Sequence, residues 1–162
     1  MVYPEDEAIT VWKKDDVTLS IVKHPHFGHL CGYARFPKPP LKTGDKGIAA
    51  YVPVHGGITF YCEYDDGSVV YGFDCAHVGD WTEFTPKGKK WTVEKIKKEA
   101  EKMVTGIRVA AKYEDRYLEA KTPRERAKVI DEYHDELRKE YGIEFDLTDN
   151  FMAMLRVFTG EL

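Results

Sequence analysis

The stretch His55-Gly56-Gly57-Ile58-Thr59-Phe60, followed closely by Gly72-Phe73-Asp74-Cys75-Ala76-His77-Val78-Gly79-Asp80, decides how we expect this chain to fold. Between the two motifs, residues 61–71 read as two strands on either side of Asp66-Gly67. An Asp-Gly pair is a strong hairpin signal, because Gly adopts a positive φ without steric cost. We therefore predict a β-hairpin that turns at residues 66 and 67.

A two-residue turn at this place fixes the register of the hairpin. It pairs Phe60 with Phe73, Cys62 with Tyr71, and Tyr64 with Val69. Directly opposed residues share a face of a sheet, so these six side chains are expected to face the core. The other face then carries Thr59 and Asp74, with His55 leaning to the same side. A slip of one residue would reverse the faces.

Two histidines and two aspartates are thereby predicted to converge at the open end of the hairpin. The spacing Asp74-x-x-His77-x-x-Asp80 puts a nitrogen or oxygen ligand at every third residue. Histidine and aspartate bind zinc, or manganese or iron where more oxygen ligands are present. The predicted ligands of a divalent metal are therefore His55, Asp74, His77 and Asp80. Such a metal would activate a water molecule for hydrolysis.

The same residues fit two interpretations without a metal. In the first, His55 is a general base oriented by Asp74, and His77 completes the catalytic group. Gly57 and Thr59 would then bind the ligand, because glycine amides can approach an anion closely. In the second interpretation, the polar residues form a hydrogen-bond network that only fixes the strand ends and the following loop, as buried polar groups commonly do.

Two further groups carry weaker signals. Cys75 is a candidate nucleophile beside His77, but strand alternation places it on the core side with Phe73. The loop that holds His24, His26 and His29 contains a metal-chelating pattern, yet an exposed polar turn explains it equally simply. We favour a core cysteine and a polar turn.

Basic and aromatic residues gather in the loop from Trp81 to Trp91, which contains Phe84 and the lysines Lys87, Lys89 and Lys90. Positive charge beside aromatic rings is typical of sites that hold a phosphate and stack a base. Trp81 and Lys89 are therefore predicted to bind a phosphorylated or nucleotide-like ligand. The alternative is a solvated loop that its aromatic residues anchor to the core.

The rest of the chain indicates the α+β class. Alternating residues predict strands at 17–22 and 30–36, and a capped apolar stripe predicts a helix at 92–113. Thr122-Pro123 begins a second helix that ends at Gly142, and Leu147 begins a short last one. We expect a small, mainly antiparallel sheet packed on one long helix, with a C-terminal helical pair. Residues 1–113 would form the core domain and 114–162 a helical extension.

Composition restricts the partners and the compartment. The net charge is −4 with no basic block, so a duplex-DNA footprint is not indicated. No apolar run approaches the roughly 20 residues of a membrane helix, and the N-terminus lacks the pattern of a secretory signal. Three cysteines without a CxxC motif predict no disulfide framework. A cytoplasmic protein is expected, and its oligomeric state is left open.

Three motifs together resemble a family of small uncharacterised proteins from bacteriophages and prophages. They are Leu30-Cys31-Gly32-Tyr33, His55 to Phe60, and Gly72 to Asp80. The resemblance covers residues 15–113 and implies the cytoplasm of a phage-infected or lysogenic bacterium, without implying a reaction. Our hypothesis is an accessory protein whose His/Asp site binds or hydrolyses a small nucleotide-like ligand. The alternative is a non-enzymatic counter-defence protein that sequesters a nucleotide signal or binds a host protein.

Overall fold

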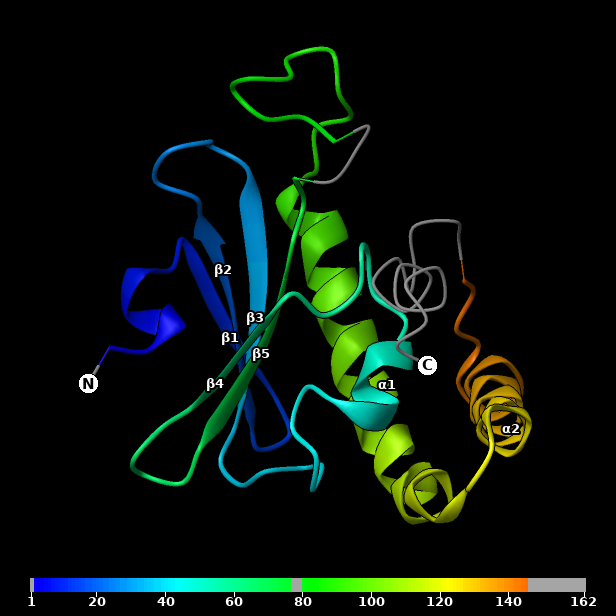
Figure 1. The fold of residues 1–162 in the computed structure, drawn as a ribbon. Coiled ribbons are helices and arrows are strands. Elements are labelled where there is room, and N and C mark those ends of the chain that lie inside the picture. The colour runs from blue at the N-terminus through cyan, green and yellow to red at the C-terminus, as the bar shows by residue number, and fades with distance from the viewer. Residues whose placement is uncertain (1, 77–79, 146–162) are drawn as a thin grey trace.

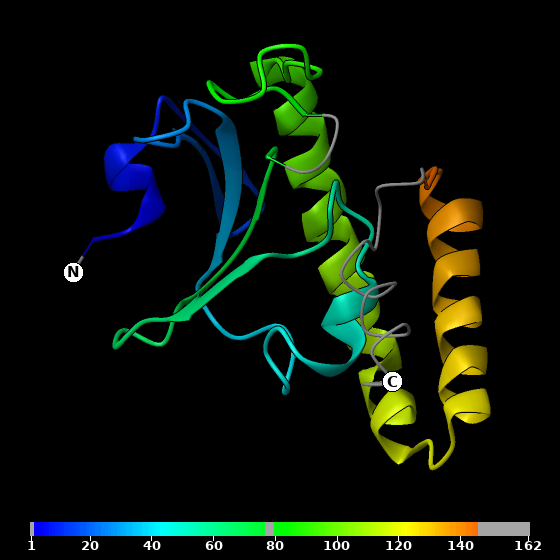
Figure 2. The ribbon, with the colours of Figure 1, turned by 45° about the horizontal axis from the view of Figure 1, so that its top comes forward.

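The structure, a computed structural model, describes residues 2–76 and 80–145. The strands β1 (Thr10–Lys14), β2 (Val17–Lys23), β3 (Leu30–Phe36), β4 (Phe60–Glu63) and β5 (Val69–Asp74) form one antiparallel sheet in the order β1-β2-β3-β5-β4. Helix α1 (Val93–Glu119) covers one face of the sheet, and α2 (Pro123–Tyr141) packs on the side of α1 away from it (Figures 1 and 2). The predicted α+β class is confirmed. The predicted last helix, from Leu147, lies outside the described residues.

Both long helices begin where their capping residues predict. The Thr92 hydroxyl accepts the backbone N–H of Lys95, and the Thr122 hydroxyl accepts that of Glu125. Each bond satisfies an amide that the first helical turn leaves without a partner. Helix α1 is longer than predicted and continues to Glu119, across the proposed boundary between residues 113 and 114. One hydrophobic cluster includes side chains from both sides of that boundary.

A glycine in α1 is explained by the close packing of its neighbours. A Cβ on Gly106 would lie 2.9 Å from the side chain of Val52. The hydroxyl of Tyr133 on α2 donates to the Gly106 carbonyl over 2.7 Å. Gly106 is a poor helix former, but because it has no side chain it allows α1 to contact both the segment before His55 and α2.

The hairpin between β4 and β5 differs from the predicted one by a single residue. Its loop spans residues 65–67, and the Tyr64 amide donates to the Ser68 carbonyl at 2.9 Å. Gly67 has a φ of +87°, as in a three-residue hairpin loop that ends in a left-handed residue. The predicted two-residue turn is therefore wrong. The observed pairs are Phe60 with Gly72, Tyr61 with Tyr71, Cys62 with Val70, and Glu63 with Val69.

The shift in register reverses the faces of β4 alone. Pairing with β3 holds β5 in place, so Val69, Tyr71 and Phe73 still point into the core as predicted. Phe60 lies instead on the outer face of the sheet, where its side chain is 40% exposed. The predictions that Phe60, Cys62 and Tyr64 face the core are wrong, because a shift of one residue exchanges the two sides of a strand.

The outer face has a partial cover of its own. The 3-10 helix η1 (Pro4–Glu7) packs on β2, and the rings of Tyr3 and Tyr64 lie 4.8 Å apart. The sequence patterns predicted neither η1 nor β1. Among the described residues, no helix combines the length and the apolar character needed to cross a membrane.

Candidate functional site

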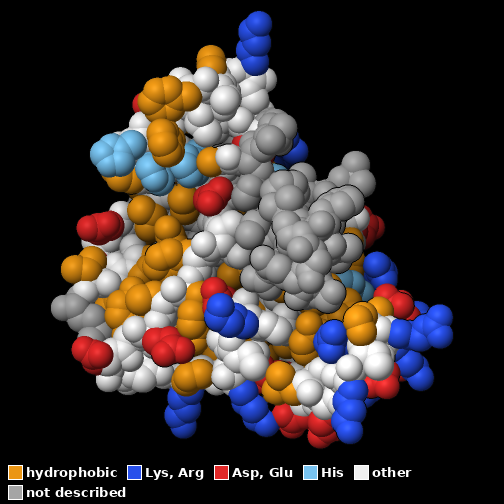
Figure 3. Space-filling view, viewed as in Figure 1, with side chains coloured by type: hydrophobic (Ala, Val, Ile, Leu, Met, Phe, Trp, Pro, Cys, Tyr) orange, Lys and Arg blue, Asp and Glu red, His pale blue; other side chains and the backbone are white. Residues whose placement is uncertain are grey.

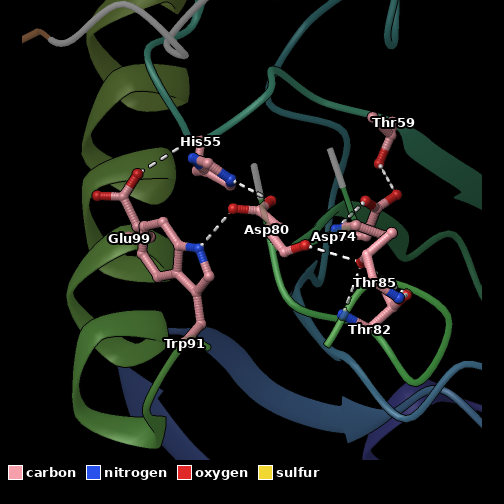
Figure 4. Close-up of polar contacts among 9 residues, drawn as sticks. His55, Thr59, Asp74, Asp80, Thr82, Thr85, Trp91 and Glu99 are labelled. Atoms are coloured by element: carbon pink, nitrogen blue, oxygen red, sulfur yellow. Dashed lines mark hydrogen bonds and ion pairs between the residues drawn. The ribbon is translucent and has the colours of Figure 1, made fainter. Parts of the chain in front are cut away.

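Three loops meet at one end of the sheet, beside the N-terminus of α1 (Figures 1 and 4). They are residues 24–29 between β2 and β3, residues 52–59 before β4, and residues 80–91 before α1. The amide of Glu83 donates to the carbonyl of Phe27 at 2.9 Å, and the rings of Phe27 and Phe84 lie 5.3 Å apart. Most residues of the predicted site lie in this region.

His55 and Asp80 form a buried pair at the centre of these loops. The Nε2 of His55 lies 2.6 Å from Oδ2 of Asp80, and the two residues are only 4% and 5% exposed. The indole N–H of Trp91 donates to the other carboxylate oxygen over 3.0 Å (Figure 4). On the helix side, the backbone N–H of His55 donates to Glu99 over 2.9 Å. One carboxylate therefore connects the segment before β4 to the start of α1.

The carboxylate beside His55 is not the one that the sequence predicted. The expected partner, Asp74, accepts the hydroxyl of Thr59 at 3.3 Å and the amide of Ala76 at 3.1 Å. Thr59 and Asp74 are thus brought together as predicted, whereas the ring of His55 bonds Asp80. The prediction that Asp74 orients His55 is wrong, because Asp80 is the carboxylate buried beside His55, while Asp74 is half-buried at the strand end.

The predicted metal set cannot be assembled from the described residues. His77, its third member and also a predicted catalytic residue, lies outside them. In the part of the chain that the structure describes, no group of three or more His, Cys, Asp or Glu side chains is arranged to hold a metal ion. A zinc, manganese or iron site therefore stays a prediction.

The glycine motif and Cys75 have structural explanations. Gly56 and Gly57 have φ values of +73° and +85°, and the Gly57 amide donates to Val54 at 2.8 Å. This amide is used within its own turn, and the two glycines make that turn possible. Cys75 is 1% exposed, and burial, with Asp80 nearby, raises the pKa of its thiol far above the ordinary value. It is a core cysteine, as we favoured.

The loop of residues 80–91 is held together by short-range bonds. The Thr85 hydroxyl donates to the Asp80 carbonyl at 3.0 Å, and the Trp81 amide donates to the Lys89 carbonyl at 2.8 Å. A Cβ on Gly88 would lie 2.1 Å from the Asp80 carbonyl oxygen, so the two ends of the loop approach closely only because residue 88 has no side chain. The conformation is therefore fixed from both ends.

A cavity of about 210 Å³, which we call the indole cavity, opens between this loop and the loop of residues 24–29. Its lining residues are Lys23, Gly28, His29, Leu30, Cys75, Trp81, Lys90 and Trp91. The Nζ of Lys90 lies 4.5 Å from the ring centre of Trp81, and that of Lys89 lies 5.2 Å from the ring centre of Trp91. The predicted ligand-binding residues Trp81 and Lys89 thus lie in or beside a cavity that combines indole rings and ammonium groups.

Two residues of this region were not among the predicted site residues. Trp91 was visible in the sequence only as an aromatic residue flanking the basic loop. Glu99 lies on the Lys-rich face of a helix, and no local pattern indicates that it accepts the amide of His55, 44 residues earlier. Their roles depend on long-range packing.

The chain matches no family model, no curated protein and no solved structure. The resemblance to small phage proteins, and the cytoplasmic setting that it implies, therefore stay predictions. Any function must be argued from the geometry of the chain itself.

Proposed function

We propose that this protein binds a small nucleotide-like anion in the indole cavity and holds it without changing it chemically. The observation that carries this proposal is the pairing of Trp81 and Trp91 with Lys90 and Lys23 around one cavity. Aromatic faces stack on bases of any identity, and lysines neutralise phosphate oxygens. In the phage setting that the motifs suggest, such a protein would sequester a nucleotide signal.

The size of the cavity limits the size of the ligand that it can hold. Its volume of about 210 Å³ is smaller than the roughly 300–1,000 Å³ of sites that enclose a drug-sized molecule. A single base or a single phosphorylated sugar fits this volume better than a dinucleotide. We therefore expect one nucleotide unit to be held, with the remainder of a larger ligand in solvent.

Burial favours binding over catalysis at the predicted His/Asp site. A general base must come within hydrogen-bonding distance of the proton that it removes. His55 and Asp80 are almost completely buried and bond each other, which suits an anchor for the loop better than a group that contacts a substrate. Hydrolysis with a metal bound through His77 stays the competing proposal.

Calorimetric titration with adenosine monophosphate, adenosine and inorganic phosphate tests the proposal. Trp81→Ala should weaken binding of the nucleotide about fivefold to 150-fold, the loss that corresponds to one stacked base. Lys90→Ala should weaken the binding of adenosine monophosphate and of inorganic phosphate, and should affect the binding of adenosine less. The matched control is Lys87→Ala, because Lys87 is an exposed lysine of the same loop that does not line the cavity.

Two outcomes would overturn this proposal. Equal affinity of the wild type, Trp81→Ala and Lys90→Ala would show that the indole cavity is not the site. Release of phosphate during the titration that disappears in His55→Ala, with the fold kept, would favour the hydrolase instead.

A further inference from the structure

A second hollow lies on the face of the sheet that α1 does not cover. This outer-face groove has a volume of about 400 Å³, and among the described residues that line the two hollows it shares only His29 with the indole cavity. Its lining residues are His24, Phe27, His29, Cys31, Tyr33, Thr59, Phe60, Phe73, Asp74 and Ala76. In Figure 3, the pale-blue histidines of the loop at 24–29 gather beside hydrophobic side chains on this side of the molecule.

Aromatic rings form the walls of the groove. The rings of Tyr33 on β3 and Phe60 on β4 lie 5.3 Å apart and stand at 89° to each other. Phe27, which is 42% exposed, comes from the loop between β2 and β3. On β5 between them, Gly72 is required, because a Cβ there would lie 2.6 Å from the Tyr33 ring. The groove thus has aromatic side chains from three separate segments, and one of them, Phe27, stacks on the ring of His24 at 4.8 Å.

The groove has one acidic side chain and no lysine or arginine among its described lining residues. Asp74 supplies the carboxylate, which accepts hydrogen bonds from the Thr59 hydroxyl and the Ala76 amide. Burial raises the pKa of the Cys31 thiol to about 12 and raises that of the Tyr33 hydroxyl. Both groups are therefore neutral at physiological pH.

His24, one of the two histidines that line the groove, is held by bonds within its own loop. The Nδ1 of His24 accepts the backbone N–H groups of His26 and Phe27 at 3.2 and 3.1 Å. Among the described residues that line the groove, Asp74 supplies the one carboxylate.

We propose that the outer-face groove binds a small organic cation that carries an alkylated ammonium group. Cations of this kind are attracted to the faces of aromatic rings, and a desolvated ring strengthens the attraction. Tyr33, Phe60 and Phe27 supply the ring faces, and Asp74 supplies the opposite charge. This site is separate from the proposed nucleotide site and does not depend on it.

Choline and its uncharged isostere 3,3-dimethylbutanol are the probes that test this inference by calorimetry and ligand-observed NMR. Choline should bind at least tenfold more tightly than the alcohol, which has the same shape without the charge. Asp74→Asn should weaken choline at least tenfold and leave the alcohol unchanged. Phe60→Leu keeps an apolar side chain but removes a ring face, and should weaken choline about threefold to thirtyfold.

The controls separate this site from general electrostatics. Asp65→Asn removes the same charge from the exposed tip of the hairpin and should leave choline binding unchanged. Equal binding of choline and the alcohol, or unchanged choline affinity in Asp74→Asn and Phe60→Leu, would overturn the proposal. The proposal would also be overturned if the groove bound a lysine-containing or arginine-containing peptide but did not bind choline. If Asp74→Asn fails to fold, the test is decided by Phe60→Leu, through the ratio of its affinity for choline to its affinity for the alcohol.

Discussion

Two buried carboxylates hold two long loops of this protein, and they do so in different ways. Glu114, which is 3% exposed, accepts the amides of Lys42 and Thr43 at 2.8 and 3.2 Å and the Thr43 hydroxyl at 2.8 Å. Its partners therefore come from one loop and are mainly backbone. Asp80 accepts side chains from two distant segments, His55 and Trp91. Glu114 fastens one loop to α1, whereas Asp80 fixes the relative position of several segments.

The two carboxylates also differ in their relation to the indole cavity. At Asp80, the rings of His55 and Trp91 lie beside each other, with their centres 4.4 Å apart, and both bond the carboxylate; Trp91 also lines the indole cavity. The comparison predicts that Asp80 supports both stability and binding, while Glu114 supports stability alone.

Asp80→Ala should have the largest effect. Removing one partner of a buried pair leaves the other without compensation and costs about 3–5 kcal/mol. The free energy of unfolding, measured by urea denaturation, should fall by this amount, and adenosine monophosphate should bind more weakly because Trp91 loses its anchor. For Asp80→Asn, both the free energy of unfolding and the affinity for adenosine monophosphate should lie between those of Asp80→Ala and the wild type.

The control for this experiment is Asp65→Ala, which removes an exposed carboxylate and should change neither quantity. A stability of Asp80→Ala within about 0.5 kcal/mol of the wild type, the usual range of surface substitutions, would contradict the anchoring role. Elemental analysis of untagged protein adds a separate test: near-stoichiometric zinc, manganese or iron that is lost in Asp80→Ala and His77→Ala would make Asp80 a metal ligand instead.

Glu114→Ala should lower the free energy of unfolding by a smaller amount, about 2–3 kcal/mol, because hydrogen bonds to a charged group are lost. The loss is smaller than at Asp80 because the released amides can turn toward water. Binding of adenosine monophosphate should be unchanged, since Glu114 lies outside the indole cavity. Urea denaturation and calorimetry measure the two effects. Asp115→Ala is the matched control, because Asp115 is the next residue and pairs with Lys42 at the exposed surface. A parallel loss of nucleotide binding in Glu114→Ala would remove the distinction between the two loops.

Local signals predicted most of the fold. The caps at Thr92 and Thr122, the left-handed Gly142 and the alternation of β2 are interactions within a few residues, so the sequence displays them directly. The hairpin was located correctly, but its register was wrong because Asp66-Gly67 fits two loop lengths. Local sequence alone does not distinguish a two-residue turn from a three-residue loop that ends in Gly67.

The candidate site was predictable in its composition more than in its contacts. The convergence of His55, Thr59, Asp74 and Asp80 on one end of the sheet follows from the hairpin, and the structure brings them into one region (Figure 4). The presence of Asp80 rather than Asp74 beside His55 is a tertiary contact between residues 25 positions apart, which no local pattern indicates. Trp91 and Glu99 depend on how α1 docks, which no short motif encodes.

His134 is a third anchor, and its substitution should have the smallest effect on the free energy of unfolding. Its Nε2 lies 2.8 Å from the carbonyl of Tyr51, joining α2 to the 3-10 helix η2 (Gly47–Tyr51), which follows the loop that Glu114 holds. Burial lowers the pKa of His134 below its ordinary value of 6.5. The folded state therefore binds fewer protons than the unfolded state, and the free energy of unfolding should decrease as the pH falls from about 6.5 through the lowered pKa.

Unlike the two carboxylates, this anchor should stabilise the fold only while it is uncharged. His134→Gln should cost about 1 kcal/mol at pH 8, the value of one hydrogen bond, and less at lower pH, where the wild type itself loses stability. Urea denaturation at several pH values measures the difference, with the exposed His26→Gln as the control. A difference between the wild type and His134→Gln that grows as the pH falls would mean that the protonated ring is stabilised in the fold, and that burial does not control this contact.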